Sequence, residues 1–449
     1  MKKAKTNQLK KALGYSFGIA ILIGGTIGVG ILRTPGAIAG MLTNYWLIIA
    51  CWVIGGIYIL IGAGSYAELA TMLPKAGGSY NYVKRAFGNY AGFLIGWFDY
   101  ITNAIAPAFF CIVISEYVLI LFPSLKSQNT IIAVAFLIAF TLLHASGVKN
   151  GSIVQQVTST IKVILFVAFI IACFTYAGLR VGGTEKTNSF YEMGVIIGFF
   201  KSLQMVLGTY DGWNAGCFFA EEDQNPSKNI PKSLYTGAII VILIYVMINA
   251  AFFYVLPVSS LAHSALAASE VAKLVFGSKG AVIVTIIAVF SVISILNAYM
   301  MIPARILFGL SRDGFFLQKG TVLNRGGTPI VALIVSSLFA MVLIVIGSFE
   351  MLFSLATFMS VIVWGLAYGS LIKLRISEPD LPRPYITWGY PWTSLIMILF
   401  SVALFVGFAY ADHKSLVVIS CIVALSYPVY LTCSRKNKNA TPPNHQPKI

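Results

Sequence analysis

The chain has 449 residues, of which 58% are hydrophobic and only 10% are charged, and its mean hydropathy is +0.84. A water-soluble domain has no use for so much apolar surface, so we predict an integral membrane protein in contact with the lipid bilayer. The formal net charge of +16 would suit a nucleic-acid partner, but none is expected, because the basic residues follow the positive-inside rule. They gather in both tails and the predicted inner loops, and few fall in the predicted outer segments: Lys126, Arg180, Lys186, Lys273, Lys279 and Lys414. Both termini are therefore expected in the cytoplasm, with the chain in the plasma (inner) membrane.

About twelve apolar segments are long enough to cross a bilayer as helices. They lie near 14–40, 45–73, 90–122, 129–146, 151–178, 192–220, 233–257, 279–311, 328–347, 350–374, 391–411 and 415–433. The prediction is an all-α membrane protein with one transmembrane domain, residues 14–434. Short cytoplasmic tails flank it at 1–13 and 435–449.

Glycines interrupt two of these segments, the first and the sixth. The first contains Gly24, Gly25, Gly28 and Gly30, and the sixth has a similar run from Gly208 to Gly216. Unwound backbone survives inside a membrane only where it lines a cavity. A pair of such breaks predicts a binding site between the inverted repeats of a secondary transporter. Helix packing would explain the first run equally well if it stood alone.

The expected repeats are spans one to five, about 14–178, and spans six to ten, about 192–374. A repeat with an odd number of spans places its second copy upside down, which gives a five-plus-five inverted repeat. Each copy opens with a discontinuous helix, so helices 1 and 6 are expected to be broken. The spans at about 391–433 lie outside the repeat.

The first break offers main-chain groups of both signs. The free N–H groups at the start of its second half suit a carboxylate, and the carbonyls that end its first half suit an ammonium. A site that accepts both a short distance apart would recognise an α-amino acid. The residues expected to form it are Gly24, Thr26, Ile27, Gly28, Val29 and Gly30.

The second break contributes Gly208, Thr209, Asp211 and Asn214 to the same expected site. A carboxylate within the membrane is costly and usually functional. Asp211 is expected to hold the substrate's amino group, attract a cationic side chain or carry a proton, and the alternative is a cap on the unwound turn. Tyr210 and Trp213 are predicted to wall the site or gate it, although packing would explain either.

Lys162 is a second charge at membrane depth, in the fifth predicted span. It shares a helix face with Gln155 and Ser159. A buried ammonium there could join carbonyls of the first half-helix to span eight, or release a proton; the alternative is a lysine that reaches the interface. Glu68 and Asp99, in spans two and three, are expected to pair structurally or to lie near lipid headgroups.

The sequence contains no enzymatic constellation. Its four histidines are scattered and it has no phosphate-binding loop, so neither a metal nor a cofactor is expected. The six cysteines fall in or at the ends of predicted spans, which implies no disulfide framework.

Several motifs in this order resemble the amino acid–polyamine–organocation superfamily, and within it the L-amino acid transporter type. They are Gly25-Thr26-Ile27-Gly28-Val29-Gly30-Ile31, Tyr66-Ala67-Glu68-Leu69, Pro74-Lys75-Ala76-Gly77-Gly78-Ser79-Tyr80, Ala86-Phe87-Gly88, Tyr210-Asp211-Gly212-Trp213-Asn214, Glu221-Glu222, Asn225-Pro226 and Asn229-Ile230-Pro231, with Pro379, Leu381, Arg383 and Pro384 after span ten. The resemblance implies the five-plus-five fold and sodium-independent exchange of L-amino acids. It also assigns coupling or gating roles to Lys162, Tyr245 and Ser294.

Two departures from the family pattern affect these expectations. Val29 stands where the family has a serine, so carboxylate binding would depend on backbone N–H groups. Gly208 stands where the family has a gating aromatic. This removes that lid over the substrate, so the family's gating scheme and its limit on side-chain size do not carry over to this chain. The loop at 123–129 lacks the cysteine through which animal relatives bond a glycoprotein, so no disulfide-linked heavy-chain partner is expected.

Three functions remain open at this point. The first is an amino acid exchanger, and the second is a proton-coupled or cationic amino acid or polyamine transporter. The third is an amino acid sensor that does not transport, which the short tails disfavour.

Overall fold

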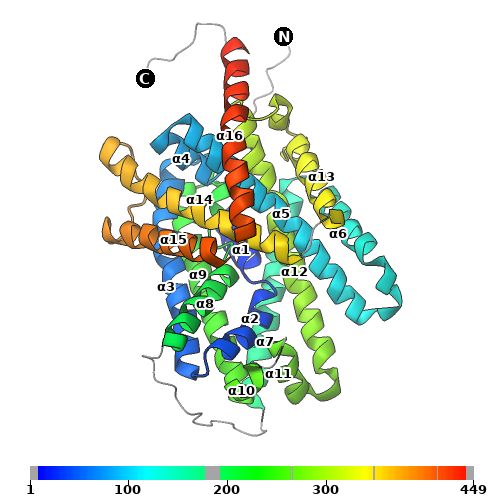
Figure 1. The fold of residues 1–449 in the computed structure, drawn as a ribbon. Coiled ribbons are helices and arrows are strands. Elements are labelled where there is room, and N and C mark those ends of the chain that lie inside the picture. The colour runs from blue at the N-terminus through cyan, green and yellow to red at the C-terminus, as the bar shows by residue number, and fades with distance from the viewer. Residues whose placement is uncertain are drawn as a thin grey trace.

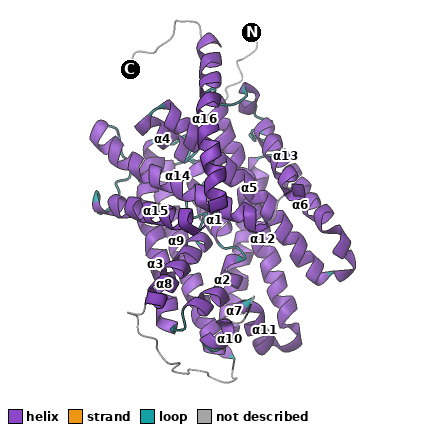
Figure 2. Ribbon diagram, viewed as in Figure 1, coloured by secondary structure: helices purple, strands orange, loops and turns teal. Residues whose placement is uncertain are grey.

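The computed structural model describes residues 9–176, 193–262, 264, 266–346, 349–411 and 413–440. Helices make up nearly all of this part of the chain, with short loops between them and no strand (Figure 2). The long helices pack side by side into one bundle (Figure 1). The all-α membrane fold predicted from the sequence is confirmed.

The first half of the chain contributes eight α-helices and a 3₁₀ turn. Their bounds are α1 Tyr15–Thr26, α2 Gly30–Met41, α3 Tyr45–Met72, α4 Ser79–Phe87, α5 Asn89–Leu121, η1 Pro123–Gln128, α6 Asn129–Ala145, α7 Val148–Thr175 and α8 Met193–Thr209.

The second half adds eight α-helices and three more 3₁₀ turns. Their bounds are η2 Ala215–Phe219, α9 Pro226–Val255, α10 Val258–Ala262, α11 Ala267–Phe276, η3 Gly277–Lys279, α12 Gly280–Arg312, η4 Gln318–Thr321, α13 Ile330–Ile346, α14 Phe349–Ser377, α15 Trp392–Ala411 and α16 His413–Ala440.

Every segment predicted to span the membrane contains a helix. Among the described residues, eight helices are long and apolar enough to cross a bilayer, or nine if the bent pair α1–α2 counts as one span. α6, α13 and residues 194–209 of α8 are apolar but shorter. The number twelve and the inverted repeat therefore stay predictions. The last helix is longer than expected: α16 continues to Ala440, because arginine and lysine favour a helix and suit its C-terminal end.

The first span is broken where the glycines predicted it. α1 ends at Thr26 and α2 begins at Gly30, and the two axes differ by 44°. The sixth span is also broken, but the break is shorter than the glycine run. α8 continues through Gly208 to Thr209, and a turn then leads to η2 at Ala215. Gly212 makes this turn possible, because its φ of +93° favours a residue without Cβ.

The two ends of the bundle differ, as Figure 1 shows, with α4 near one end and α10 and α11 at the other. At the α4 end, the backbone of Ala12 and Leu13 donates to the carbonyl of Glu222, and Gln224 N–H donates back to Leu13. These bonds fasten the segment that precedes α1 to the loop that precedes α9.

Glu68 forms the structural pair expected of it. Its carboxylate is fully buried and accepts hydrogen bonds from Arg375 at 2.8 and 2.5 Å and from the Thr387 N–H at 2.7 Å. Arg383 Nε lies 3.5 Å from the same carboxylate. The group joins α3 to α14 and to the loop that follows it.

Candidate functional site

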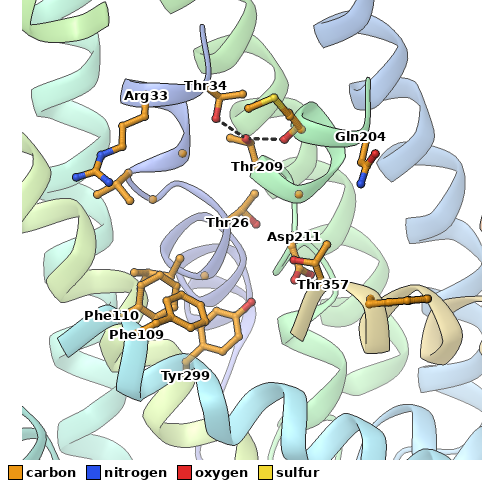
Figure 3. Close-up of a pocket in the computed structure, with 18 of the residues that line it drawn as sticks. Thr26, Arg33, Thr34, Phe109, Phe110, Gln204, Thr209, Asp211, Tyr299 and Thr357 are labelled. Carbon is orange, nitrogen blue, oxygen red and sulfur yellow. Dashed lines mark hydrogen bonds between the residues drawn. The ribbon is translucent and has the colours of Figure 1, made fainter. Parts of the chain in front are cut away.

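A cavity of about 560 Å³ lies beside both broken helices. Seven of the expected site residues line it: Thr26, Gly28, Val29, Gly30, Gly208, Thr209 and Asp211. Its other walls come from α5, α12, α14 and α15, and Figure 3 shows most of the residues that line it. The remaining expected residues do not line this cavity: Gly24, Ile27, Asn214, Tyr210, Trp213, Lys162, Tyr245 and Ser294.

The cavity has a polar and an aromatic end. Figure 3 shows Phe109, Phe110 and Tyr299 together at one end, and Thr34 and Gln204 at the other. Exposed residues at the end of α2 and on α8, Met41 and Lys201, also line it. Since α2 packs against α10 and α11, the cavity opens toward that end of the bundle.

Tyr245 joins the two breaks directly. Its buried hydroxyl lies 2.9 Å from the carbonyl oxygen of Thr26 and 3.0 Å from that of Thr209. The breaks also touch at glycine, since a Cβ on Gly212 would lie 2.5 Å from the carbonyl oxygen of Gly25. A side chain at position 212 would push the two breaks apart, whereas a Cβ on Gly25 would make only ordinary contacts.

Lys162 holds the first break without lining the cavity. Its Nζ is buried and donates to the carbonyl oxygens of Gly24 at 3.0 Å and Ile27 at 2.5 Å. Ser291 on α12 donates to the same Ile27 carbonyl at 2.9 Å. The lysine does not reach the membrane interface: it ties the first break to α12 through a shared carbonyl.

α7 and α12 also hold α1 one turn before Gly24, at Ala20. Ser159 and Gln155 on α7 both donate to the carbonyl of Ala20, at 2.8 and 3.1 Å. Asn297 on α12 donates to Gln155 at 2.7 Å. Ser294 belongs to this group, because its hydroxyl lies 3.1 Å from that of Ser159. Ser291, which sequence reasoning missed, is the α12 hydroxyl that shares a carbonyl with the lysine, although it lies only one turn from Ser294.

Asp211 forms the cap that was the alternative to a substrate role. Its Oδ1 accepts from the Gly212 N–H at 2.7 Å, which caps the turn, and the side chain also lines the cavity. Figure 3 places it beside Thr357 of α14. Asn214, by contrast, lines a separate small pocket together with Asp99.

The two aromatic residues of the second break stand behind the site. Tyr210 is buried, donates to the Trp52 carbonyl at 3.1 Å and packs against the ring of Tyr245. Trp213 packs edge-on against Tyr66. Both support the backbone of the break from outside the cavity.

Ion pairs close the α4 end, and sequence reasoning missed them. Arg305 and Glu222 form a buried bidentate pair at 2.8 and 3.1 Å. Arg312 pairs with Glu221 at 2.8 Å, and Glu221 also accepts from the Ala76 N–H. The adjacent acids Glu221 and Glu222 carried the signal, but their partners are far along the chain.

Comparison with known proteins agrees with this geometry. The model of the amino acid permease family matches residues 13–427. The b(0,+)-type amino acid transporter 1 of Mus musculus is 28% identical over 396 residues, which cover 85% of this chain and 79% of the relative. The serine/threonine exchanger SteT of Bacillus subtilis (strain 168) is 27% identical over 399 residues, covering 87% and 90%. The large neutral amino acids transporter small subunit 2 of Homo sapiens is 28% identical over 397 residues, covering 84% and 72%.

Proposed function

This chain belongs to the amino acid permease family, and from that premise we propose that it exchanges L-amino acids across the plasma membrane by alternating access, without sodium. It is an amino acid transporter of the multi-pass membrane type and not an enzyme. The observation that carries the proposal is one cavity lined by both helix breaks.

The cavity offers complementary main-chain groups to a zwitterion. The N–H groups at the start of α2, from Gly28 to Gly30, have no acceptor within the helix and would receive the carboxylate. The ammonium would lie between Thr26 of the first break and the second break, where Gly208 and the carboxylate of Asp211 line the cavity. Val29 lines the cavity without a hydroxyl, which agrees with carboxylate binding by the backbone alone.

The aromatic end of the cavity would take the substrate's side chain. Phe109, Phe110 and Tyr299 supply apolar surface there, and Gly208 lines the cavity without adding a side chain to it. Ligand sites of about 300–1,000 Å³ bury most of a small molecule, so this cavity has room for an amino acid.

Alternating access is supported by the unequal ends of the bundle. The cavity opens toward α10 and α11, while ion pairs and the backbone bonds of Leu13 seal the α4 end. The reverse state would require the Arg305–Glu222 seal to part. We place the α4 end and both termini in the cytoplasm, following the charge distribution.

Independence from sodium is supported by Lys162. Its ammonium already supplies a positive charge to the carbonyls of the first break, so no metal cation is required there. We also propose that the chain works without a disulfide-linked heavy chain, because residues 123–129 contain no cysteine.

The test is counter-flow into proteoliposomes loaded with unlabelled amino acid. Labelled alanine, serine, leucine and phenylalanine are added outside, with choline replacing sodium, and arginine and putrescine serve as competitors. We expect uptake that needs internal amino acid and persists in choline. Uptake that requires sodium, or ligand binding with no flux, would contradict the proposal, and stronger competition by arginine or putrescine than by neutral amino acids would favour a cationic substrate.

A further inference from the structure

Three acids inside the described structure lie outside any ion pair: Asp99 is buried, Asp211 is half-buried, and the buried Asp223 accepts hydrogen bonds from the Asn225 N–H and the Asn229 side chain. Glu68 is paired with Arg375, and Glu222 with Arg305. Asp99 on α5 and Asp211 in the second break have no described lysine or arginine within 4.0 Å. Burying a charge without a partner is costly, so these two carboxylates need an explanation of their own.

Asp99 and Asp211 face the same small pocket, next to the large cavity. Its volume is about 20 Å³, close to the minimum of about 10–15 Å³ that holds a single water molecule. The other polar residues that line it are Thr102, Asn103, Asn214 and Ser360. The pocket is too small for a guanidinium or any amino acid.

Two polar side-chain atoms at this pocket have no hydrogen-bond partner among the described residues. Asp99 is only 4% exposed, and its Oδ1 accepts from Asn103 at 3.0 Å, but its Oδ2 has no partner. The hydroxyl of Thr102, 7% exposed, also has none. A carboxylate can only accept hydrogen bonds, whereas a protonated carboxyl can donate one. A proton on Asp99 Oδ2 would therefore let this oxygen donate a hydrogen bond.

Among the described residues, no lysine or arginine lines the small pocket, although Arg33 and Lys201 line the large cavity together with Asp211. Lys162 is committed to carbonyls of the first break. The groups that face the two acids from the packed elements are hydroxyls and an amide: Tyr66 on α3, Ser79 and Tyr82 on α4, Asn103 on α5, Tyr299 on α12, and Tyr58 of α3 toward Asp211.

We propose that Asp99 and Asp211 hold one proton between them while the cavity is empty, and that an arriving amino acid displaces it. Two neighbouring carboxylates in a medium of low dielectric repel each other, and a shared proton removes that repulsion. Asp211 and Tyr299 line both the small pocket and the large cavity, so they connect the two sites.

The positive charge of the arriving ammonium replaces that of the proton lost from Asp99 and Asp211. The substrate's ammonium approaches Asp211 from the cavity and supplies the positive charge that the proton had supplied. The O–H bond of the carboxyl breaks, its electron pair stays on the oxygen, and the proton leaves to water through the open cavity. The inference rests on the proposed amino acid site and adds a titrating group to it.

The experiment counts protons during binding. Purified full-length protein is titrated with the amino acid that counter-flow selects, by calorimetry near neutral pH in two buffers with different ionisation heats. We expect about one proton released per amino acid bound, and weaker binding as the pH is lowered. The variant Asp99→Asn should bind the amino acid with little proton release, whereas Glu116→Gln, exposed on the same helix, should release protons like the wild type.

The outcomes separate this inference from the proposed function. Binding by the wild type without proton release would overturn the inference and leave the transporter intact, as would unchanged release from Asp99→Asn. Displacement of sodium in place of a proton, seen as binding that responds to sodium at constant pH, would overturn it too. If Asp99→Asn does not fold, the wild-type proton count decides alone, and a failure to bind any amino acid would refute the proposed function itself.

Discussion

Replacing Lys162 with alanine tests the mechanism most directly. The substitution removes both hydrogen bonds from the ammonium to the carbonyls of Gly24 and Ile27. Ile27 keeps its bond from Ser291, but no other hydrogen bond to the Gly24 carbonyl is present among the described residues. The first break would therefore lose its fixed shape while its partners across the cavity stay in place.

The size of the effect follows from the number of bonds. A hydrogen bond to a charged group contributes about 1.5–3 kcal/mol, and relief from burying the ammonium offsets part of this, so we take about 3 kcal/mol for the two together. Each 1.4 kcal/mol is about tenfold in an equilibrium. The population with a correctly shaped break should therefore fall about 100-fold, and exchange with it.

The assay is counter-flow of labelled amino acid into proteoliposomes with equal amounts of folded protein, checked by gel filtration. Lys149→Ala is the matched control, because this lysine lies on the same helix and is exposed. We expect Lys149→Ala to exchange like the wild type and Lys162→Ala to lose about two orders of magnitude. A folded Lys162→Ala protein that exchanges at the wild-type rate would refute the role of the lysine.

Three further substitutions test other parts of the structure. Tyr245→Phe removes the hydroxyl between the two breaks while the ring stays, and should weaken amino acid binding about tenfold; unchanged affinity in a binding titration would count against that link. Glu222→Gln leaves Arg305 buried without an anion and should lower the free energy of unfolding by about 3–5 kcal/mol, measured by thermal melting in detergent, while Glu270→Gln, which breaks an exposed pair, should cost at most about 1 kcal/mol. Gly208→Phe should place a ring inside the cavity next to Thr209, so phenylalanine would stop competing for uptake while alanine still competes; equal loss for both would show that this position does not set the size limit.

The sequence predicted the helices and the breaks because both depend on local features. Apolar length defines a span, and clustered glycine marks a place where the helix ends. The second break was predicted too long, because Gly208 remains helical and only the turn around Gly212 needs a positive φ. Glycine composition alone does not distinguish these two situations.

The contacts of the site could be predicted only in part, because they join distant parts of the chain. Lys162 was recognisable as a buried charge, but its two carbonyl partners depend on how α7 packs against α1. Ser291 and Ser294 lie on nearly the same face of α12, so sequence spacing could not decide between them. Asp99 appeared structural, because nothing in the sequence places it beside Asp211.

α7 and α12 bind the first span through its main-chain carbonyl oxygens and not through its side chains. Ala20, Gly24 and Ile27 are each recognised by a carbonyl that every amino acid possesses. These carbonyl contacts therefore do not depend on which side chain stands at Ala20 or Ile27, although both side chains are buried and limited by packing. We therefore expect sequence conservation at the donors Gln155, Ser159 and Lys162. A comparison of sequences limited to the helix that accepts these hydrogen bonds would not detect it.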